Sequence, residues 1–193
     1  MLKIGLTGSI GMGKTTTAAL FRARGAPVHD SDAAVHLIYQ GVGVALISEA
    51  FPGVVVNGVV DRQLLSQRVL GNPTALAHLE NIVHPLVSEH RAQFLHSAEK
   101  AGEVLAVLDI PLLFETGQVE HLDLIVVVTA PLEIQRERVL SRPGMTPEKF
   151  QAILSRQLSD VEKRRRAHVV IETHRGIDYA DRQIEALIRT LAR

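Results

Sequence analysis

Residues 8–15, Gly-Ser-Ile-Gly-Met-Gly-Lys-Thr, have the types and spacing of a loop that binds phosphate, G-x-x-x-x-G-K-[ST]. Its three glycines can adopt backbone angles closed to other residues, so that successive amides point inward around a phosphate. In such a loop Lys14 reaches the β and γ phosphates of a nucleotide, and the Thr15 hydroxyl binds Mg²⁺. The pattern therefore indicates binding of a nucleoside triphosphate together with its metal ion.

The segments on either side of the loop decide whether the match is meaningful. Residues 2–7 form a short apolar run that predicts a buried strand, and residues 15–24 predict a helix. The amino end of that helix adds unpaired N–H groups and a partial positive charge on the phosphate side. A chance match in an ordinary glycine-rich turn is the alternative, and the order of strand, turn and helix disfavours it.

Two aspartates follow the second predicted strand, which begins at Val28. Ligands of open α/β sheets bind outside the carboxyl ends of the strands, so acids there are well placed for chemistry. We expect Asp32 to accept or orient the proton of an attacking hydroxyl, and Asp30 to cap a helix or support the site. The alternative for Asp32 is that it caps the helix predicted over residues 33–39.

A third acid, Asp109, follows the apolar run of residues 104–108, which predicts a buried parallel strand. Enzymes with a phosphate loop keep an acid near Mg²⁺ at such a position. We therefore expect Asp109 in the site, because its strand should lie beside the phosphate loop. The alternative is a turn or cap residue before Pro111.

Residues 134–166 contain nine Lys or Arg and four Asp or Glu, although the whole chain has a formal net charge of zero. Arg138 and Arg142 are four residues apart and share a helix face. We interpret the segment as a mobile lid whose arginines neutralise phosphate charge, the alternative being a solvated helix face. For most of residues 163–166 we favour the solvated face, at the end of a helix predicted from Thr146 onward with Val161 on its core side.

Five short apolar strands alternating with helices predict an α/β fold in three layers, α/β/α, around a five-stranded parallel sheet. The crossover of residues 33–100 is far longer than a βα unit needs, which indicates a helical insertion. Within this insertion we expect Pro85 to kink or restart a helix. We expect three functional parts: a nucleotide-binding core of residues 1–32, 101–133 and 167–193, a helical acceptor-binding insertion of residues 33–100, and a lid of residues 134–166.

Composition excludes several classes of protein. The zero net charge gives no global basic field, so no nucleic-acid partner is expected. The chain has no cysteine, which excludes disulfides and thiolate metal sites. No apolar run approaches the length of a membrane span and the first strand starts at Leu2, so we expect a cytoplasmic protein without a membrane partner, as a monomer or small homo-oligomer.

Several stretches together match a known family, and two of them, Leu-Glu-x-Ile-x-His-Pro at 79–85 and Pro-Leu-Leu-Phe-Glu at 111–115, are far more specific than the phosphate loop alone. The matching stretches are residues 4–15; Asp30-Ser31-Asp32 with His36; residues 58–65 through Asp61, Arg62 and Leu65; Leu-Glu-x-Ile-x-His-Pro at 79–85; Asp-Ile-Pro-Leu-Leu-Phe-Glu at 109–115; Gln135 to Arg142; and Gln157. In these stretches, over nearly its whole length, the chain resembles the dephospho-CoA kinases. It departs from the family run A-D-x-V-I-x-N at residues 167–173, where His168 and Thr173 replace the aspartate and the asparagine, which puts an adenine contact there in doubt.

The resemblance implies transfer of the γ-phosphoryl group of ATP, with Mg²⁺, to the 3′-hydroxyl of the ribose of dephospho-CoA. The implied residues are, for the nucleotide, Gly8, Gly11, Met12, Gly13, Lys14, Thr15 and Thr16; for catalysis, Asp32, Lys14, Arg138 and Arg142; for Mg²⁺, Thr15 and Asp109; and for the acceptor, Arg62, His84 and Asp109. With Pro85 beside it, His84 serves equally well as a residue that caps and kinks its helix.

Two other functions remain open from the sequence alone. Another small-molecule or nucleoside monophosphate kinase would use the same scaffold and differ only in its acceptor. A non-catalytic nucleotide-binding module is the further alternative, and the acids and lid arginines argue against it, since binding alone needs none of them. A GTPase is disfavoured because no N-K-x-D or T-K-x-D guanine motif occurs in the chain.

Overall fold

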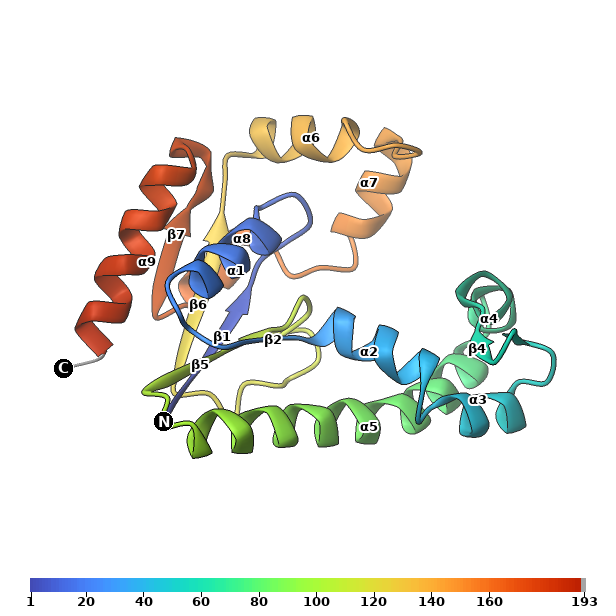
Figure 1. Cartoon of the computed structure of the whole chain (residues 1–193). Helices are drawn as coiled ribbons and strands as arrows, with labels where there is room; N and C mark the ends of the chain where they lie inside the picture. The colour runs from blue at the N-terminus through green and yellow to red at the C-terminus, as the bar shows by residue number, and fades with distance from the viewer. Residues whose placement is uncertain (192–193) are drawn as a thin grey trace. The chain divides into compact units, whose positions relative to one another are not determined.

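The computed structural model describes residues 1–191 (Figure 1). The chain divides into two compact units, one made of residues 1–29 with the chain from Ala98 onward, and the other of Asp30–Ser97. The predicted lid, residues 134–166, lies within the first of them.

The first unit is built on a five-stranded sheet in the order β2-β5-β1-β6-β7. Its strands are β1 (Leu2–Thr7), β2 (Val28–Asp30), β5 (Leu105–Asp109), β6 (Leu124–Thr129) and β7 (Val169–Glu172). β1 pairs in parallel with both β5 and β6, and β6 with β7, so the carboxyl ends of these strands share one edge. The predicted parallel sheet and its five strands are confirmed.

Helices α1 (Lys14–Ala23) and α9 (Ile177–Leu191) pack against each other and close the main core of this unit (Figure 1). Alternate strand residues such as Ile4, Val126 and Ile171 are fully buried against them, together with Phe21 of α1. This alternation follows from the pleat of the strands, which sends successive side chains to opposite faces. The remaining elements of the first unit are α6 (Leu132–Leu140), α7 (Pro147–Leu154), α8 (Asp160–Arg165) and the 3₁₀ turn η1 (Thr173–Arg175).

The single helix predicted from Thr146 into residues 163–166 is wrong. The chain leaves the helical path after Leu154, and α8 begins anew where the Ser159 hydroxyl accepts a hydrogen bond from the Glu162 N–H. Serine at a helix start satisfies one of the orphan donors of the first turn, so a second helix can begin there. Val161, predicted on the core side, is instead 73% exposed.

The second unit is mostly helical and has its own core around Ile47, Val54 and Leu65. It contains α2 (Ser31–Gln40), α3 (Val44–Ala50), the hairpin β3 (Val55–Val56) and β4 (Val59–Val60), α4 (Arg62–Val69) and most of α5 (Pro73–Lys100). The hairpin turns through Asn57 and Gly58, both at positive φ, as the Asn-Gly pair predicts. α5 continues through Pro85 without restarting, so the predicted restart is wrong; α3 was not predicted.

Within residues 1–191, none of the helices alone has the length and apolar character of a membrane span. Among the described helices, α2 and α3 reach that length and composition when taken together, and they are bent by 77° where they meet.

Candidate active site

The phosphate loop joins β1 to α1, and Lys14 is the first residue of that helix. Gly11 and Gly13 have φ angles of 77° and 91°, in the left-handed region that disfavours residues with a Cβ atom. At Gly13 a Cβ atom would also lie only 3.1 Å from the side chain of Thr173. The conformation of the loop therefore depends on glycine at these positions, as predicted.

Gly8 serves the loop for another reason than the one predicted. Its φ lies outside the positive region, so no unusual backbone angle requires glycine there. A Cβ atom at this position would overlap the Val128 side chain and lie 2.9 Å from the Val128 carbonyl oxygen. Gly8 is therefore needed because β1 and β6 approach each other closely where the loop begins.

Lys14 and Asp109 meet at the edge of the sheet. The Lys14 Nζ lies 2.6 Å from Asp109 Oδ1, and Asp109 is 2% exposed. Their proximity follows from the register of the parallel pair, which sets Leu6, two residues before the loop, opposite Asp109. The structure thus brings together the loop lysine and the acid after the neighbouring strand, which are 95 residues apart in sequence.

The residues expected to hold Mg²⁺ have suitable chemistry. Mg²⁺ in kinase sites keeps several waters and binds one or two protein oxygens together with substrate phosphates. Asp109 supplies a buried carboxylate, and Thr15 supplies an exposed hydroxyl in the first turn of α1. In the described part of the chain no group of three His or acidic residues is arranged to hold a metal by itself.

Side chains from later in the chain hold the outer side of the phosphate loop. Gln157 Oε1 accepts a hydrogen bond from the Ile10 N–H at 3.1 Å, and Gln135 Nε2 donates to the Ile10 carbonyl at 2.7 Å. The Thr173 hydroxyl donates to the Met12 carbonyl at 2.8 Å. Because these bonds satisfy peptide groups on the outside of the loop, they favour one loop conformation.

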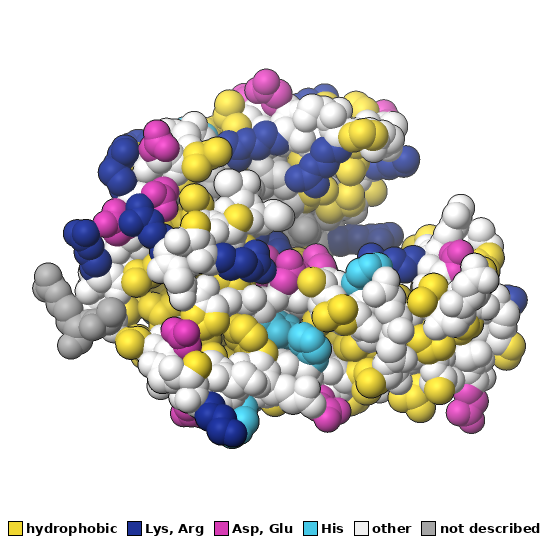
Figure 2. Space-filling view, in the orientation of Figure 1, with side chains coloured by type: hydrophobic (Ala, Val, Ile, Leu, Met, Phe, Trp, Pro, Cys, Tyr) yellow, Lys and Arg dark blue, Asp and Glu magenta, His cyan; other side chains and the backbone are white. Residues whose placement is uncertain are grey.

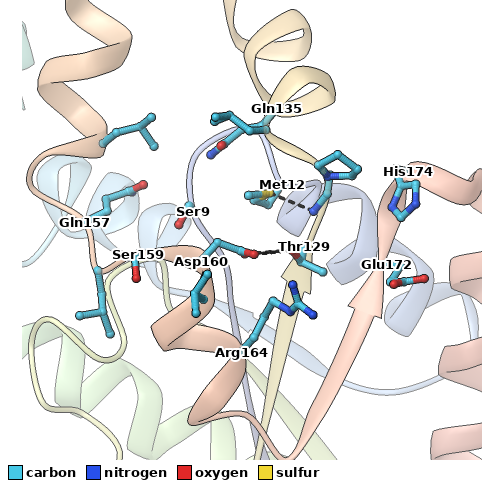
Figure 3. A pocket seen from close by; sticks show the side chains of 16 residues that line it. Ser9, Met12, Thr129, Gln135, Gln157, Ser159, Asp160, Arg164, Glu172 and His174 are labelled. Atoms are coloured by element: carbon cyan, nitrogen blue, oxygen red, sulfur yellow. Dashed lines mark hydrogen bonds between the residues drawn. The ribbon is translucent and has the colours of Figure 1, made fainter.

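A cavity of about 580 Å³ lies beside this outer side of the loop (Figure 3). Ser9 and Met12 of the loop line it, whereas Lys14 and Thr15 are not among its lining residues. In Figure 3 one dashed line joins the Ala130 N–H to the Met12 sulfur, and another joins the Thr129 hydroxyl to Asp160. The walls combine the ends of β6 and β7 with the first turns of α6 and α8 and with the segment that joins α7 to α8.

The two departures from the family pattern both make structural hydrogen bonds. The Ile125 N–H donates to His168 Nδ1 at 3.0 Å, so the imidazole ties β7 to β6. Thr173 bonds the loop at Met12 and accepts a hydrogen bond from Arg138 at 2.9 Å. Both replacements therefore retain an acceptor, and the Thr173 hydroxyl, like the amide of an asparagine, also supplies a donor.

The two predicted lid arginines differ in their surroundings. Arg138 is partly buried, donates to the hydroxyl and to the carbonyl of Thr173, both at 2.9 Å, and approaches the Gly11 carbonyl at 3.5 Å. Arg142 is exposed beyond the end of α6. Lys and Arg side chains gather over α6 and α7 in Figure 2. The exposed basic residues of this part of the chain are Arg136, Arg142, Lys149 and Arg156. Arg138 thus contacts the phosphate loop, while Arg142 remains at the surface.

Residues 164–166 are exposed, as predicted for most of residues 163–166, but Lys163 is not. Its side chain is fully buried, and its Nζ lies 2.9 Å from Glu115 Oε1. Burial by itself raises the pKa of Glu115, but hydrogen bonds from Lys163 and from the Leu158 N–H outweigh it, so that the pKa lies below its ordinary value. No local pattern predicts this pair, because Lys163 opens a run of four basic residues whose other members are exposed.

The remaining predicted residues lie in the second unit. The Asp30 side chain accepts a hydrogen bond from the Ala33 N–H and caps α2, which leaves Asp32 exposed in the first turn. Arg62 lies over the Tyr39 ring, 5.7 Å from its centre; burial raises the pKa of Tyr39, and the Arg62 charge opposes that rise. His84 is exposed on α5. Asp30 is therefore the cap that the sequence predicted, and Asp32 is free of that role.

Comparison with known proteins agrees with this geometry. The family model described as "CoaE: Dephospho-CoA kinase" matches residues 2–178. A protein named dephospho-CoA kinase from Mesorhizobium japonicum is 56% identical over 191 residues, which are 99% of this chain and 97% of that one. Among solved structures, TT1252 from Thermus thermophilus has a TM-score of 0.84 and 36% identity, covering 98% of this chain and 97% of that chain. A dephospho-CoA kinase from Campylobacter jejuni shares the fold, with a TM-score of 0.67 at 22% identity over 98% of this chain and 96% of that chain.

Proposed function

The chain belongs to the dephospho-CoA kinase family, and from this we infer that it transfers the γ-phosphoryl group of ATP to the 3′-hydroxyl of the ribose of dephospho-CoA, giving coenzyme A and ADP. In the structure, the observation that carries this function is the 2.6 Å pair of Lys14 and Asp109 at the mouth of a phosphate loop. It joins the cation that binds phosphate to an acid suited to a metal ion, as phosphoryl transfer requires.

The nucleotide is held by the phosphate loop. The amides of Gly11, Met12 and Gly13 surround the phosphates, and Thr16 continues the first turn of α1, whose amino end favours negative charge. Lys14 exchanges its partner Asp109 for the β and γ phosphates when ATP binds. The exchange keeps the ammonium paired throughout, which avoids the cost of an isolated charge in a partly buried place.

Mg²⁺ accompanies ATP in this proposal. The Thr15 hydroxyl and the Asp109 carboxylate, released from Lys14, are the protein oxygens that would hold it. When bound there, the ion would supply positive charge that stabilises the charge developing on the transferring phosphoryl group. Lys14 supports this assignment, because the buried Asp109 carboxylate is paired with the Lys14 ammonium when no ligand is bound and would be paired with the metal ion when ATP is bound.

Asp32 is the proposed base that accepts or orients the proton of the acceptor hydroxyl. Its neighbour Asp30 already caps α2, so Asp32 is not required for the helix start. Proton transfer by a positioned carboxylate typically contributes about 10² to 10⁴ in rate. Arg62 and His84 in the same unit are the proposed contacts for the acceptor, and Arg62 is pre-positioned over Tyr39.

The lid arginines have different proposed tasks. Arg142, exposed after α6, neutralises charge on the transferring group when the lid closes. The closed lid also excludes water that would otherwise accept the phosphoryl group. Arg138 assists from the loop side, since it bonds Thr173 and reaches the Gly11 carbonyl. A cytoplasmic location and a monomer or small homo-oligomer stay predictions.

The test is transfer from ATP and Mg²⁺ to a panel of acceptors, namely dephospho-CoA, AMP, adenosine and water, with products identified by mass. We expect one product, heavier than dephospho-CoA by one phosphoryl group, and none from the other acceptors. Phosphorylation of AMP or adenosine instead would identify another kinase on the same scaffold. Binding of ATP without any transfer would indicate a nucleotide-binding module.

A further inference from the structure

The peptide groups of Ile10 in the phosphate loop are held from two directions. Gln135 of α6 donates to the Ile10 carbonyl, and Gln157 accepts from the Ile10 N–H. Gln135 is 2% exposed and Gln157 is partly buried, and Figure 3 shows the two side chains coming from different segments. Ile10 directly precedes Gly11, so its orientation sets where the amides of the following residues point.

Gln157 lies in the non-helical segment between α7 and α8, where its own N–H donates a turn-type hydrogen bond to the Leu154 carbonyl at 3.0 Å. A second contact, one residue further on, ties this segment to another part of the chain. The Leu158 N–H donates to Glu115 Oε1 at 2.7 Å, and the same oxygen lies 2.9 Å from the Nζ of Lys163. Glu115 follows the segment that begins at Asp109, so this contact ties the residues after β5 to the segment that carries Gln157.

A buried ammonium is costly unless it is paired, so a fully buried Lys163 leaves the Glu115 carboxylate little freedom to move away. With Glu115 fixed, the Leu158 peptide is fixed, and the adjacent Gln157 side chain is directed at Ile10. Arg166 also lies over the Phe114 ring, 5.9 Å from its centre, which adds a second link between the same two segments.

We propose that Gln157 is a positioning residue for the nucleotide, which sets the phosphate loop through the Ile10 peptide, and that the Glu115–Lys163 pair holds Gln157 in place through Leu158. A loop already ordered for phosphates binds them more tightly, because less conformational freedom is lost on binding. This inference rests on the proposed binding of ATP to the loop, but not on the identity of the acceptor.

The first test replaces Gln157 with Met, which keeps the length of the side chain and removes the acceptor. ADP is titrated into the protein by calorimetry at a temperature at which the unliganded variant is fully folded. We expect ADP affinity to fall about fivefold, the equivalent of about one hydrogen bond. Gln151→Met is the matched control, an exposed glutamine on α7, and should bind ADP as the wild type does.

The second test asks whether Glu115 acts through Gln157. The variant Glu115→Leu/Lys163→Met removes the pair without leaving a buried charge, and should lose about as much ADP affinity as Gln157→Met. Adding Gln157→Met to this double variant should cause no further loss of ADP affinity, because all three substitutions release the same peptide group, that of Ile10. In Glu115→Gln/Lys163→Met the amide oxygen still accepts from the Leu158 N–H, so affinity should be rescued to within about twofold of the wild type.

Gln157→Met with ADP affinity unchanged within twofold would overturn the proposal, and so would losses that multiply in the triple variant. A purely structural role would lower the unfolding temperature and leave ADP affinity unaltered. If Glu115→Leu/Lys163→Met fails to fold, Gln157→Met and Glu115→Gln/Lys163→Met still test the proposal. If the wild type itself binds no ADP, the proposed function fails rather than this inference.

Discussion

The phosphate loop and the second unit present their predicted functional residues in different ways. The loop residues are fixed before any ligand binds: Lys14 is paired with Asp109, and the peptides of Ile10 and Met12 are hydrogen-bonded from outside. In the second unit Asp32, Arg62 and His84 are exposed, and Arg62 makes a cation–π contact with the Tyr39 ring.

This difference indicates how the two substrates are recognised. A triphosphate is bound mainly by backbone amides, and amides can be aimed only by fixing the chain that carries them. The acceptor is to be bound by long, exposed side chains, which adjust after contact. Changes in the loop should therefore affect ATP binding and rate together, whereas changes in the second unit should affect one of the two steps selectively.

The largest selective effect is expected from Asp32→Asn. If Asp32 is the base, the turnover number should fall by about 10² to 10⁴ with the Michaelis constant for ATP nearly unchanged, in steady-state assays. Asp30→Asn is the matched control, because asparagine caps a helix as well as aspartate does, and it should turn over normally. Near-normal turnover in Asp32→Asn would show that Asp32 is not the base.

Lys14→Ala should reduce the turnover number by about 10² to 10³ and also raise the Michaelis constant for ATP, since the ammonium contacts phosphate before and during transfer. The same loss should appear in ADP titrations. Lys100→Ala, an exposed lysine at the end of α5, provides the control. An effect on turnover alone would contradict the view that the loop couples binding to rate.

Much of the nucleotide side was predictable because local rules determine it. The Gly-rich turn between a strand and a helix, the cap at Asp30 and the position of Asp109 each follow from short patterns. The burial of Lys163 depends on Glu115, which is 48 residues away in sequence and gives no local sign, whereas the start of α8 follows from the cap at Ser159. Likewise α5 passes through Pro85 because packing outweighs local propensity.

In the second unit a smaller and purely acceptor-side effect is expected from Arg62→Ala. Losing one charged contact should raise the Michaelis constant for dephospho-CoA about tenfold and leave that for ATP unchanged. Arg68→Ala on the same helix is exposed and should have no effect on either constant. An equal rise in both constants would mean that Arg62 supports the fold through Tyr39 rather than binding the acceptor.

The smallest effect concerns pH. The pKa of Glu115 lies below its ordinary value of 4.5 because hydrogen bonds from Lys163 and the Leu158 N–H outweigh the effect of burial. A lowered pKa contributes stability that is present above pH 4.5 and is lost as pH falls through the folded-state value. The thermal stability of the wild type relative to Glu115→Gln/Lys163→Met should therefore be constant from about pH 5.5 to 7.5 and fall below pH 4.5. A wild type that gains stability relative to this variant on acidification would contradict this pairing.

The central claim, transfer of a phosphoryl group from ATP to the ribose 3′-hydroxyl of dephospho-CoA, is tested most directly by the position of the new phosphate. One reaction with ATP, Mg²⁺ and dephospho-CoA is run to completion, and the product is examined by phosphorus–proton NMR correlation. We predict a phosphate coupled to the ribose 3′ proton, in a spectrum identical to that of coenzyme A. A phosphate on any other hydroxyl, or only inorganic phosphate released from ATP, would contradict the account.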